Sequence, residues 1–432
     1  MNYQESIDWL FSQLPMFSRV GAAAYKPGLE RSEALAEFFG NPHHKFKSIH
    51  IAGTNGKGSV SNLMAAVLQS QGYKVGLYTS PHLIDFRERI RINGEMISKE
   101  EVAEFVSKWI ATEYSGDKPS FFELTMIMAF EWFARQQVDY AVIEVGMGGR
   151  LDSTNIITPV LSVITNISKD HTQFLGNTLT EIASEKAGII KPGIPVVIGE
   201  AVNETEKVFR EKASSVAAPL REAYREIDEI DNSALNCPLK GDYQKKNVNT
   251  ARIAIDELIR SGVVISDSAI AKGFAEVETI TGFKGRWTIV SDSPLTICDT
   301  GHNEAGLRFN LTQLQKILND RPGAMLRFVI GFVADKDIDN ILKLFPADAE
   351  YYLSNAQMPR ALPAGILYEK FLEAGNVPAE NLRHFPSVKG AFNQALSDSS
   401  PEDIVFIGGS TFIVADYLSS FSFKKETESK RI

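Results

Sequence analysis

The sequence predicts an α/β protein built on mostly parallel β-sheets, and three observations support this fold class. Short apolar segments rich in β-branched residues alternate with segments of helical periodicity. The apolar segments are nearly continuous in hydrophobicity, which is typical of strands buried on both faces of a sheet. The chain has 432 residues, of which 44% are hydrophobic, so we expect two or three domains rather than one core.

The predicted elements form two series along the chain. In the first we expect helices at residues 59–72 and 122–136 and strands at residues 47–54, 74–80, 138–145, 160–167 and 194–199. A polar stretch from about residue 200 to 242 interrupts the alternation. The second series has strands within residues 294–302, 324–332, 350–356 and 402–410. We therefore predict an N-terminal domain of residues 1–288 and a smaller, Rossmann-like C-terminal domain of residues 289–432.

Composition and charge exclude several classes of protein. The net charge of −9 would repel a phosphate backbone, so we expect no nucleic-acid partner. The two cysteines, Cys237 and Cys298, form no CxxC pair, which argues against a disulfide framework and against a zinc site. The first residues are acidic where a signal peptide would be basic, and no apolar run is as long as a membrane span. We expect a cytoplasmic protein without a membrane partner.

A glycine-rich turn between a predicted strand and a predicted helix is suited to phosphate. In IHIAGTNGKGSVSNLM (49–64) the glycines allow several backbone N–H groups to face one anion, and the helix adds its positive end. Lys57 can reach the β- and γ-phosphates, and Ser59 is a hydroxyl near the metal. The predicted nucleotide contacts are Thr54, Asn55, Gly56, Lys57, Gly58 and Ser59. The turn departs from GxxxxGK[ST] because Gly58 follows the lysine, and a turn without a ligand is the alternative. We accordingly predict a P-loop-type ATPase domain.

Polar residues also follow the neighbouring predicted strands. Ser80 follows the second strand, Glu144 ends the third, and His171 comes after the fourth. Because ligands gather at the carboxyl ends of parallel strands, we expect these side chains near the phosphate turn. Oxygen ligands suit Mg²⁺, whereas imidazole is less usual. Taken alone, His171 is better explained as a capping or surface residue, and Glu144 as either a ligand or a buried structural carboxylate.

Six motifs resemble those of the dihydrofolate synthase/folylpolyglutamate synthase family, which belongs to the Mur ligase superfamily. They are GTNGKGS (53–59), TSPHL (79–83), FFELT (121–125), EVGMGGRLDSTN (144–155), DHTQFLG (170–176) and EKAGIIKPG (185–193). The glycine after the lysine of the phosphate turn is the form that this superfamily uses.

The resemblance implies a metal site and a modified lysine. Ser80, Glu144 and His171 would bind Mg²⁺, with His171 and Lys57 also taking part in catalysis. Lys186 matches the lysine that these enzymes carbamylate, and its carbamate would hold a second Mg²⁺. From the residues alone, Lys186 is better explained as a lysine in the last turn of a helix, where it suits the helix dipole.

The resemblance extends to the second half of an ATP site. GDYQKKNVNTARIAI (241–255) is similar to the family's YQxxN element, which implies that Asn247 contacts adenine, with Gln244 beside it. A simple helix start is the alternative. Arg286 matches an ATP-binding arginine, and CDTGHNEAG (298–306) is similar to D-x-A-H-N-P, which implies that Asp299 lies near the ribose with His302 and Asn303 beside it. Gly301 and Glu304 replace the usual Ala and Pro, which puts the rigidity of this loop in doubt.

The activity that the resemblance implies is ATP-dependent addition of L-glutamate to dihydropteroate, to folate (poly)glutamates, or to both. A carboxylate would attack the γ-phosphate of ATP, and the amine of glutamate would then attack the acyl phosphate. The acid would contact Lys26, Pro27, Gly28, Ser120, Phe121, Phe122, Glu123, Leu151, Asp152 and Ser153. Phe121 and Phe122 could stack on a flat heterocycle, but aromatic residues at a helix start are more often core residues. Family members are mostly monomers, and closure of the C-terminal domain is our hypothesis for the exclusion of water.

Other functions predict different sequences. A nucleotide kinase or GTPase would have Ser or Thr directly after the lysine and no partner motif downstream. A peptidoglycan Mur ligase would carry an extra N-terminal substrate domain, whereas here the phosphate turn begins some fifty residues into the chain. A degenerate nucleotide-binding module with a regulatory role would have lost Lys57, Glu144 or Lys186, and all three are present.

Overall fold

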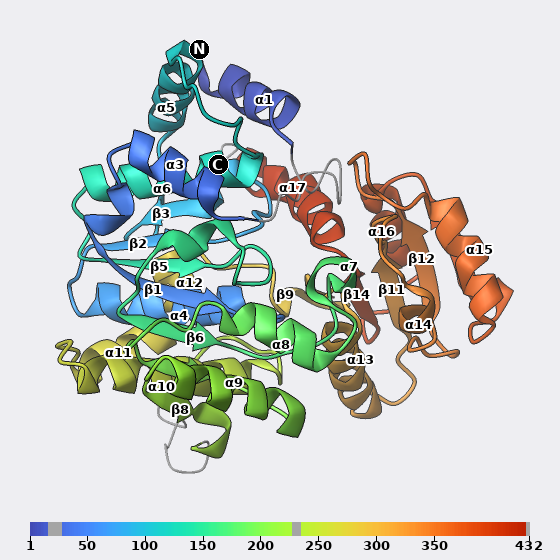
Figure 1. The fold of residues 1–432 in the computed structure, drawn as a ribbon. Helices are drawn as coiled ribbons and strands as arrows, with labels where there is room; N and C mark the ends of the chain where they lie inside the picture. Colours follow the sequence, from blue (N-terminus) through green and yellow to red (C-terminus); the bar gives the residue numbers. More distant parts are fainter. Residues whose placement is uncertain (16–27, 227–234, 429–432) are drawn as a thin grey trace. The chain divides into compact units, whose positions relative to one another are not determined.

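The chain folds as two compact units, shown as a ribbon in Figure 1. The computed structural model describes residues 1–15, 28–226 and 235–428. The first unit comprises Met1–Pro238 and Tyr243–Phe283, and the second comprises Leu239–Asp242 and Lys284–Ile432. The chain therefore passes from one unit to the other three times. Our prediction of domains at residues 1–288 and 289–432 stays a prediction.

The sheet of the first unit is mostly parallel. Within the described residues its strand order is β4-β3-β2-β5-β1-β6-β7-β8, and only β3 and β4 are antiparallel to their neighbours. The strands are β1 (Lys47–Ala52), β2 (Val75–Tyr78), β3 (Ile90–Ile92), β4 (Glu95–Met96), β5 (Tyr140–Glu144), β6 (Leu161–Ile164), β7 (Val196–Ile198) and β8 (Leu220–Glu222). The strand that precedes the phosphate turn, β1, lies in the middle between β5 and β6.

The helices of the first unit cover this sheet. They are α1 (Tyr3–Gln13), α3 (Glu30–Phe38), α4 (Lys57–Ser70), α5 (Lys99–Ala111), α6 (Phe121–Arg135), α7 (Thr172–Leu175), α8 (Leu179–Ala187), α9 (Asn203–Ser215), α10 (Gln244–Arg260), α11 (Asp267–Ala275) and α12 (Val277–Thr281). Helix α4 packs against β1, β2 and β5 and is itself covered by α10, α11 and α12. The phosphate turn is thus anchored to a strand and a helix that are both buried.

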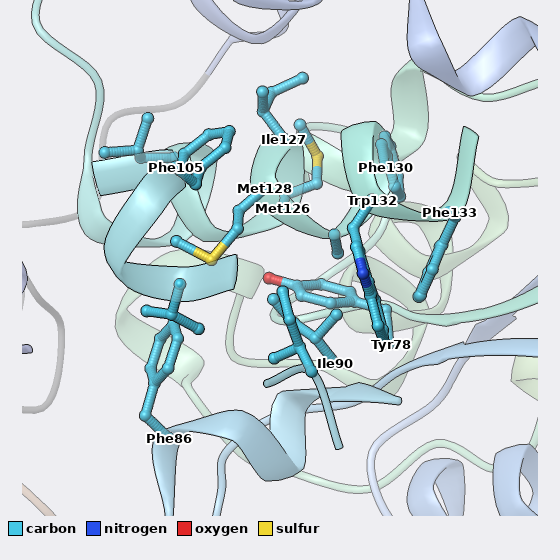
Figure 2. Close-up of a cluster of buried hydrophobic side chains, with 14 of the residues drawn as sticks. Tyr78, Phe86, Ile90, Phe105, Met126, Ile127, Met128, Phe130, Trp132 and Phe133 are labelled. Atoms are coloured by element: carbon cyan, nitrogen blue, oxygen red, sulfur yellow. The ribbon is translucent and has the colours of Figure 1, made fainter. Parts of the chain in front are cut away.

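A second group of helices packs on the core cluster shown in Figure 2. Helix α6 contributes more of the apolar side chains there than any other described element, and Tyr78 at the end of β2 is fully buried among them. From β5 the cluster includes Ala141 and Ile143. Because side chains alternate between the faces of a strand, Glu144 points to the opposite face from Ile143.

The second unit contains another mostly parallel sheet. Its strand order is β13-β12-β11-β14-β10-β9, with only the edge strand β9 antiparallel. The strands are β9 (Thr288–Asp292), β10 (Leu295–Cys298), β11 (Leu326–Ile330), β12 (Glu350–Ser354), β13 (Leu382–Phe385) and β14 (Ile404–Gly408). The helices are α13 (Glu304–Asn319), α14 (Asp339–Leu342), α15 (Ala364–Ala374), α16 (Val388–Ser397) and α17 (Thr411–Glu428). Among the described residues, no helix combines the length and the hydrophobicity needed to cross a lipid bilayer.

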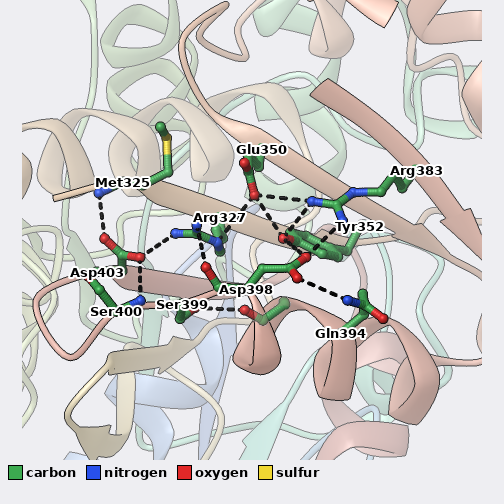
Figure 3. Close-up of polar contacts among 11 residues, drawn as sticks. Met325, Arg327, Glu350, Tyr352, Arg383, Gln394, Asp398, Ser399, Ser400 and Asp403 are labelled. Atoms are coloured by element: carbon green, nitrogen blue, oxygen red, sulfur yellow. Dashed lines mark hydrogen bonds and ion pairs between the residues drawn. The ribbon is translucent and has the colours of Figure 1, made fainter. Parts of the chain in front are cut away.

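A network of buried and partly exposed charges joins the amino ends of the second sheet's strands (Figure 3). Arg327 in β11 is 7% exposed and forms ion pairs with Asp403, which precedes β14, and with Glu350 in β12. Arg383 in β13 continues the network to Glu350 and Asp398. Every charge in this network has a partner of opposite sign, as the low polarity of a protein interior requires.

The α/β fold class is confirmed, and the main differences from the prediction lie in the stretch from residue 200 to 242. The sheet continues there, because α9 and β8 add one more helix and strand after β7. Helix α9 has few apolar residues, and those that are buried, such as Phe209 and Ala213, face the sheet. The short hairpin β3–β4 and the helix α5 were also not predicted.

Candidate functional site

The phosphate turn links β1 directly to α4. Gly53 and Gly56 have φ angles of +146° and +86°, a region that L-residues with a side chain rarely adopt. A Cβ atom at position 53 would overlap the hydroxyl of Thr165, and one at position 56 would overlap the amide of Asn247. Glycine is therefore required at both positions for conformation and for space.

The segment after β6 holds the turn in place. The backbone N–H of Asn55 donates to Asn166 Oδ1 (3.0 Å), and Asn166 Nδ2 donates back to the Asn55 carbonyl (3.1 Å). The Thr54 hydroxyl donates to the Ser168 carbonyl (3.1 Å), and Thr165 donates to the Asn55 carbonyl. Sequence reasoning missed these supporting residues, although their position beyond the end of an apolar strand was a usable signal.

Two lysines converge on one carbonyl of the turn. The Lys57 ammonium donates to the carbonyls of Gly53 and Thr54, both at 3.1 Å. Lys186, near the end of α8, donates to the same Gly53 carbonyl at 3.0 Å and is only 4% exposed. Burial, together with the charge of Lys57, lowers the pKa of Lys186 to about 7, against the opposing effect of Asp170 and Asp152. Lys186 is therefore not a solvated lysine at a helix end.

A buried carboxylate lies beside the turn. Glu144, at the end of β5, is 5% exposed, and its Oε2 accepts a hydrogen bond from the Ser80 N–H at 3.2 Å. A Cβ atom on Gly58 would be 3.9 Å from the same oxygen. The structure thus brings Glu144, Ser80 and the first turn of α4 together.

Ser59 and His171 differ in how they relate to this group. The Ser59 side chain is 1% exposed, and its hydroxyl has no hydrogen-bond partner among the described residues. His171 is half-buried and precedes α7 with a φ of +50°. Its backbone N–H donates to Asp170 Oδ1 at 2.9 Å. The described ranges contain no group of three or more His, Cys, Asp and Glu side chains arranged to hold a metal ion.

Asn247, the predicted adenine contact, lies against the phosphate turn. It is buried in the first turn of α10, and its Oδ1 occupies the space beside Gly56. Its Nδ2 donates to Gln244 Oε1 at 2.8 Å. The two polar side chains that the YQxxN element contributes are therefore in contact with each other.

The remaining predicted nucleotide residues lie in the second unit, where Asp299, His302 and Asn303 follow β10 and Arg286 precedes β9. The Asp299 carboxylate is 2% exposed and accepts from Trp287 N (2.8 Å), Gly301 N (2.7 Å) and Asn310 Nδ2 (2.9 Å). It therefore organises its own loop. A Cβ atom on Gly301 would lie 2.8 Å from Asp299 Oδ1, so alanine at this position would require a small shift of the Asp299 side chain.

The residues around Asp299 are also held by local contacts. Asn303 caps α13 by accepting from the N–H of Gly306 (2.9 Å). His302 Nδ1 lies 2.9 Å from the Thr300 carbonyl, and Lys336 donates to the His302 carbonyl (3.2 Å). Arg286 is half-buried on the segment before β9.

The residues predicted to contact the acid fall into two structural classes. Ser120 and Glu123 form a reciprocal capping box at the start of α6, and Glu123 also pairs with Arg31 (3.2 Å), so local structure already uses both. Phe121 is a core residue with 3% exposure. Phe122 is half-buried and touches the loop after β5, since a Cβ atom on Gly146 would lie 2.6 Å from its ring.

The loop after β5 contains the other predicted acid contacts. Leu151 and Ser153 are half-buried, whereas Asp152 is buried and caps the short 3-10 helix Ser153–Ile156. Gly28 has a φ of +122°, and Lys26 and Pro27 lie outside the described residues.

A buried histidine, missed by sequence reasoning, supports Asp152. The Thr154 hydroxyl donates to Asp152 Oδ1, so it must accept from His50 Nε2, which lies 2.9 Å away. Asp152 Oδ2 accepts from the N–H of Met147 at 2.8 Å. A histidine within an apolar strand was the signal that could have identified this chain of hydrogen bonds.

Comparisons with known proteins cover both units. Residues 51–218 match the family model "Mur ligase middle domain" and residues 285–411 match "Mur ligase, glutamate ligase domain". The dihydrofolate synthase/folylpolyglutamate synthase of Bacillus subtilis (strain 168) is 33% identical over 443 residues, which cover 96% of this chain and 98% of the relative.

Solved structures agree with the sequence comparison. Escherichia coli FolC in complex with DHPP and ADP superposes with a TM-score of 0.83 at 29% identity, covering 98% of this chain and 99% of that one. A bifunctional folylpolyglutamate synthase/dihydrofolate synthase with Mn, AMPPNP and L-glutamate bound has a TM-score of 0.80 at 28% identity, covering 98% of each chain.

Proposed function

The chain belongs to the dihydrofolate synthase/folylpolyglutamate synthase family of Mur ligases, and on that premise we propose that it is an ATP-dependent ligase that joins L-glutamate to a pterin-type carboxylic acid. The acid is dihydropteroate, a folate (poly)glutamate, or both. The observation that carries the proposal is the phosphate turn, where two lysines share the Gly53 carbonyl beside the buried carboxylate of Glu144.

The reaction that we propose needs two steps. A carboxylate of the acid attacks the γ-phosphorus of ATP, which gives an acyl phosphate and ADP. The neutral amine of glutamate then attacks the acyl carbon, inorganic phosphate leaves with the electrons of the C–O bond, and the phosphate takes up the proton that the nitrogen loses as the amide forms. Lys57 and the N–H groups at the start of α4 face the phosphates and stabilise the charge that spreads over the transferring group.

The residues around the turn fit a divalent cation. Ser59 carries a buried hydroxyl without a partner, and Glu144 supplies a buried carboxylate, which are the hard oxygen ligands that Mg²⁺ prefers. In our proposal Ser80, Glu144 and His171 hold Mg²⁺, which supplies positive charge to the phosphates. A nucleotide-bound Mg²⁺ usually takes only one or two protein carboxylates, so this small set is sufficient.

Lys186 is the proposed site of carbamylation. Carbon dioxide reacts with a neutral amine, and a pKa of about 7 leaves about half of Lys186 neutral at pH 7. The carbamate would carry a negative charge and could hold a second Mg²⁺ next to the phosphate turn. The short distance to the Gly53 carbonyl supports this placement.

For the acid we favour a position on the half-buried Phe122 and the loop of Leu151, Asp152 and Ser153. Phe122 has an exposed part on which a flat ring can stack, whereas Phe121 is enclosed in the core. In the first unit the nucleotide would use the phosphate turn and Asn247. In the second unit, Arg286, Asp299, His302 and Asn303 are our proposed nucleotide contacts. We also propose that the protein acts as a cytoplasmic monomer.

The test of the proposed function is release of ADP from the purified protein with Mg²⁺ and ATP. We expect release only when glutamate is present together with dihydropteroate or tetrahydrofolate, and mass spectrometry should find a product one glutamyl residue heavier. Dependence on dihydropteroate, tetrahydrofolate or both distinguishes the two activities. If neither acid stimulates ADP release, the proposed function is wrong.

The carbamate has its own test. Lys186→Ala should lose activity and should recover part of it when a short carboxylate such as acetate is added. Incubation with ¹³C-bicarbonate should give a carbamate signal in the wild-type protein that is missing in this variant. Unchanged activity of Lys186→Ala would remove the carbamate from the mechanism.

A further inference from the structure

Arg89 is a buried arginine at the same edge of the first sheet as the phosphate turn. It closes the short 3-10 helix Phe86–Arg89 and directly precedes β3. Its backbone carbonyl accepts a hydrogen bond from the N–H of Thr79 at 3.0 Å, which fixes it beside the end of β2. The next residue after Thr79 is Ser80, whose N–H donates to Glu144.

The guanidinium of Arg89 has few partners for a buried charge. The residue is 5% exposed, its Nε donates to His82 Nδ1 at 2.8 Å, and its Cζ lies 5.4 Å from the centroid of the Phe121 ring. In the part of the chain that the structure describes, the guanidinium has no other hydrogen bond, and no carboxylate lies within ion-pair distance. Among the described residues, the two terminal NH₂ groups therefore have no hydrogen-bond acceptor.

Arg327 in the second unit shows how this protein otherwise treats a buried arginine. Its exposure is similar, at 7%, but it is paired with the carboxylates of Asp403 and Glu350 (Figure 3). A buried charge is costly unless it is paired and hydrogen-bonded. Glu144 and Glu88 act on the Arg89 charge electrostatically but lie beyond ion-pair distance, so its terminal NH₂ groups remain available to an anionic ligand.

The contacts of Arg89 connect the two parts of the proposed site. His82 lies two residues after Ser80, and Phe121 directly precedes Phe122 on α6. The lysines of the phosphate turn lie elsewhere, on the Gly53 carbonyl. Arg89 lies next to Phe121, the neighbour of Phe122 on which we place the ring of the acid, so the acid is the anion that fits this position, whereas the ATP phosphates face the turn.

We infer that Arg89 binds the reacting carboxylate of the acid substrate through charge-assisted hydrogen bonds from its terminal NH₂ groups. This inference rests on the proposed function and adds a substrate contact to it. The planar guanidinium matches the two oxygens of a carboxylate and holds them in a fixed orientation. Such a contact applies equally to the benzoate carboxylate of dihydropteroate and to the γ-carboxylate of a glutamyl chain.

The experiment measures binding of dihydropteroate and of an analogue in which hydrogen replaces the carboxyl group, to the protein with ADP and Mg²⁺. Hydrogen bonds to charged groups imply that the wild-type protein prefers the acid by about tenfold to a hundredfold. Arg89→Met should abolish the preference, and Arg89→Lys should keep only part of it. The control is Arg87→Met, because Arg87 already has Asp85 as its partner (2.7 Å), and it should keep the full preference.

Kinetics separate a substrate contact from a structural role. Loss of Arg89 should raise the KM for the acid at least tenfold, because the contact exists before the chemical step, and should leave the KM values for ATP and glutamate within about twofold. A rise in all three constants, or a preference for the acid that survives in Arg89→Met, would overturn the inference. If Arg89→Met does not fold, the inference stands or falls on the wild-type preference and on Arg89→Lys. A wild-type protein that releases ADP as proposed, but binds both ligands equally, would refute the role of Arg89 and leave the proposed function intact.

Discussion

Replacement of His50 by glutamine should make the protein less sensitive to acid. His50 is fully buried in β1 and must donate from Nε2 to Thr154. Burial, aided by the charge of Lys191, lowers its pKa from 6.5 to about 3. Between pH 6.5 and 3 the unfolded chain therefore binds a proton at this position that the folded protein does not. The contribution of His50 to the free energy of unfolding is therefore fully present above pH 6.5, and it decreases as the pH falls from 6.5 to 3.

The size of the effect follows from the pKa of His50 in the two states. A pH of 5 is 1.5 units below the pKa of 6.5 that His50 has in the unfolded chain, so the unfolded histidine is protonated. The folded protein still holds His50 neutral at this pH. At about 1.4 kcal/mol per unit, acidification from pH 7 to 5 lowers the free energy of unfolding by about 2 kcal/mol through this group alone.

Urea denaturation at pH 7 and at pH 5 measures this contribution. His50→Gln should lose about 2 kcal/mol less than the wild-type protein between the two values, whatever its stability at pH 7. His384→Gln is the matched control, because that side chain is exposed in the folded protein, and it should follow the wild type. An equal loss of stability in His50→Gln and in the wild type would refute the reasoning.

Further substitutions test three other parts of the structure. Gly273→Ala should destabilise the protein by about 1–3 kcal/mol in urea despite the better helix propensity of alanine, because the added Cβ would lie 2.5 Å from the backbone of α4; a gain in stability would contradict this packing. Phe121→Ala should cost about 3–5 kcal/mol of stability, whereas Phe122→Ala should mainly raise the KM for the acid, and the opposite pattern would reverse their roles. Asp403→Ala should cost about 1–3 kcal/mol, because a buried N–H group of Arg327 loses its acceptor while the ion pair with Glu350 remains. Arg327→Met/Asp403→Leu should recover most of this loss, and a double variant no more stable than the single one would argue against the ion pair.

The parts of the site that could be predicted from sequence are those with local signals. Gly53 and Gly56 adopt backbone angles that residues with a side chain rarely adopt, so a short sequence motif is enough to predict the phosphate turn. Glu144 could be placed because a parallel sheet brings the ends of its strands to one edge. Both inferences need only the order of strand, turn and helix along the chain.

Other features depend on contacts between distant parts of the chain. The burial of Lys186 follows from the packing of α8 next to the phosphate turn, and its sequence is the same as that of an ordinary helix end. The lone guanidinium of Arg89 has no local signal either. Ser120 and Glu123 are a different case, because Ser-x-x-Glu before an apolar run is a local capping signature that we did not use, and the structure shows the capping box.

The path of the chain at residues 239–242 restricts how the protein can be divided. The N–H of Asp242 donates to the Gln313 side chain (2.7 Å), which donates in turn to the Lys240 carbonyl (3.2 Å). A fragment that starts at Lys284 would lack this segment and would leave Gln313 on α13 without both partners. Proteolysis at one of the three crossings would leave the units joined by the other two. The second unit is thus poorly suited to transfer into another protein as a single continuous segment, because it is built from two separate segments of the chain.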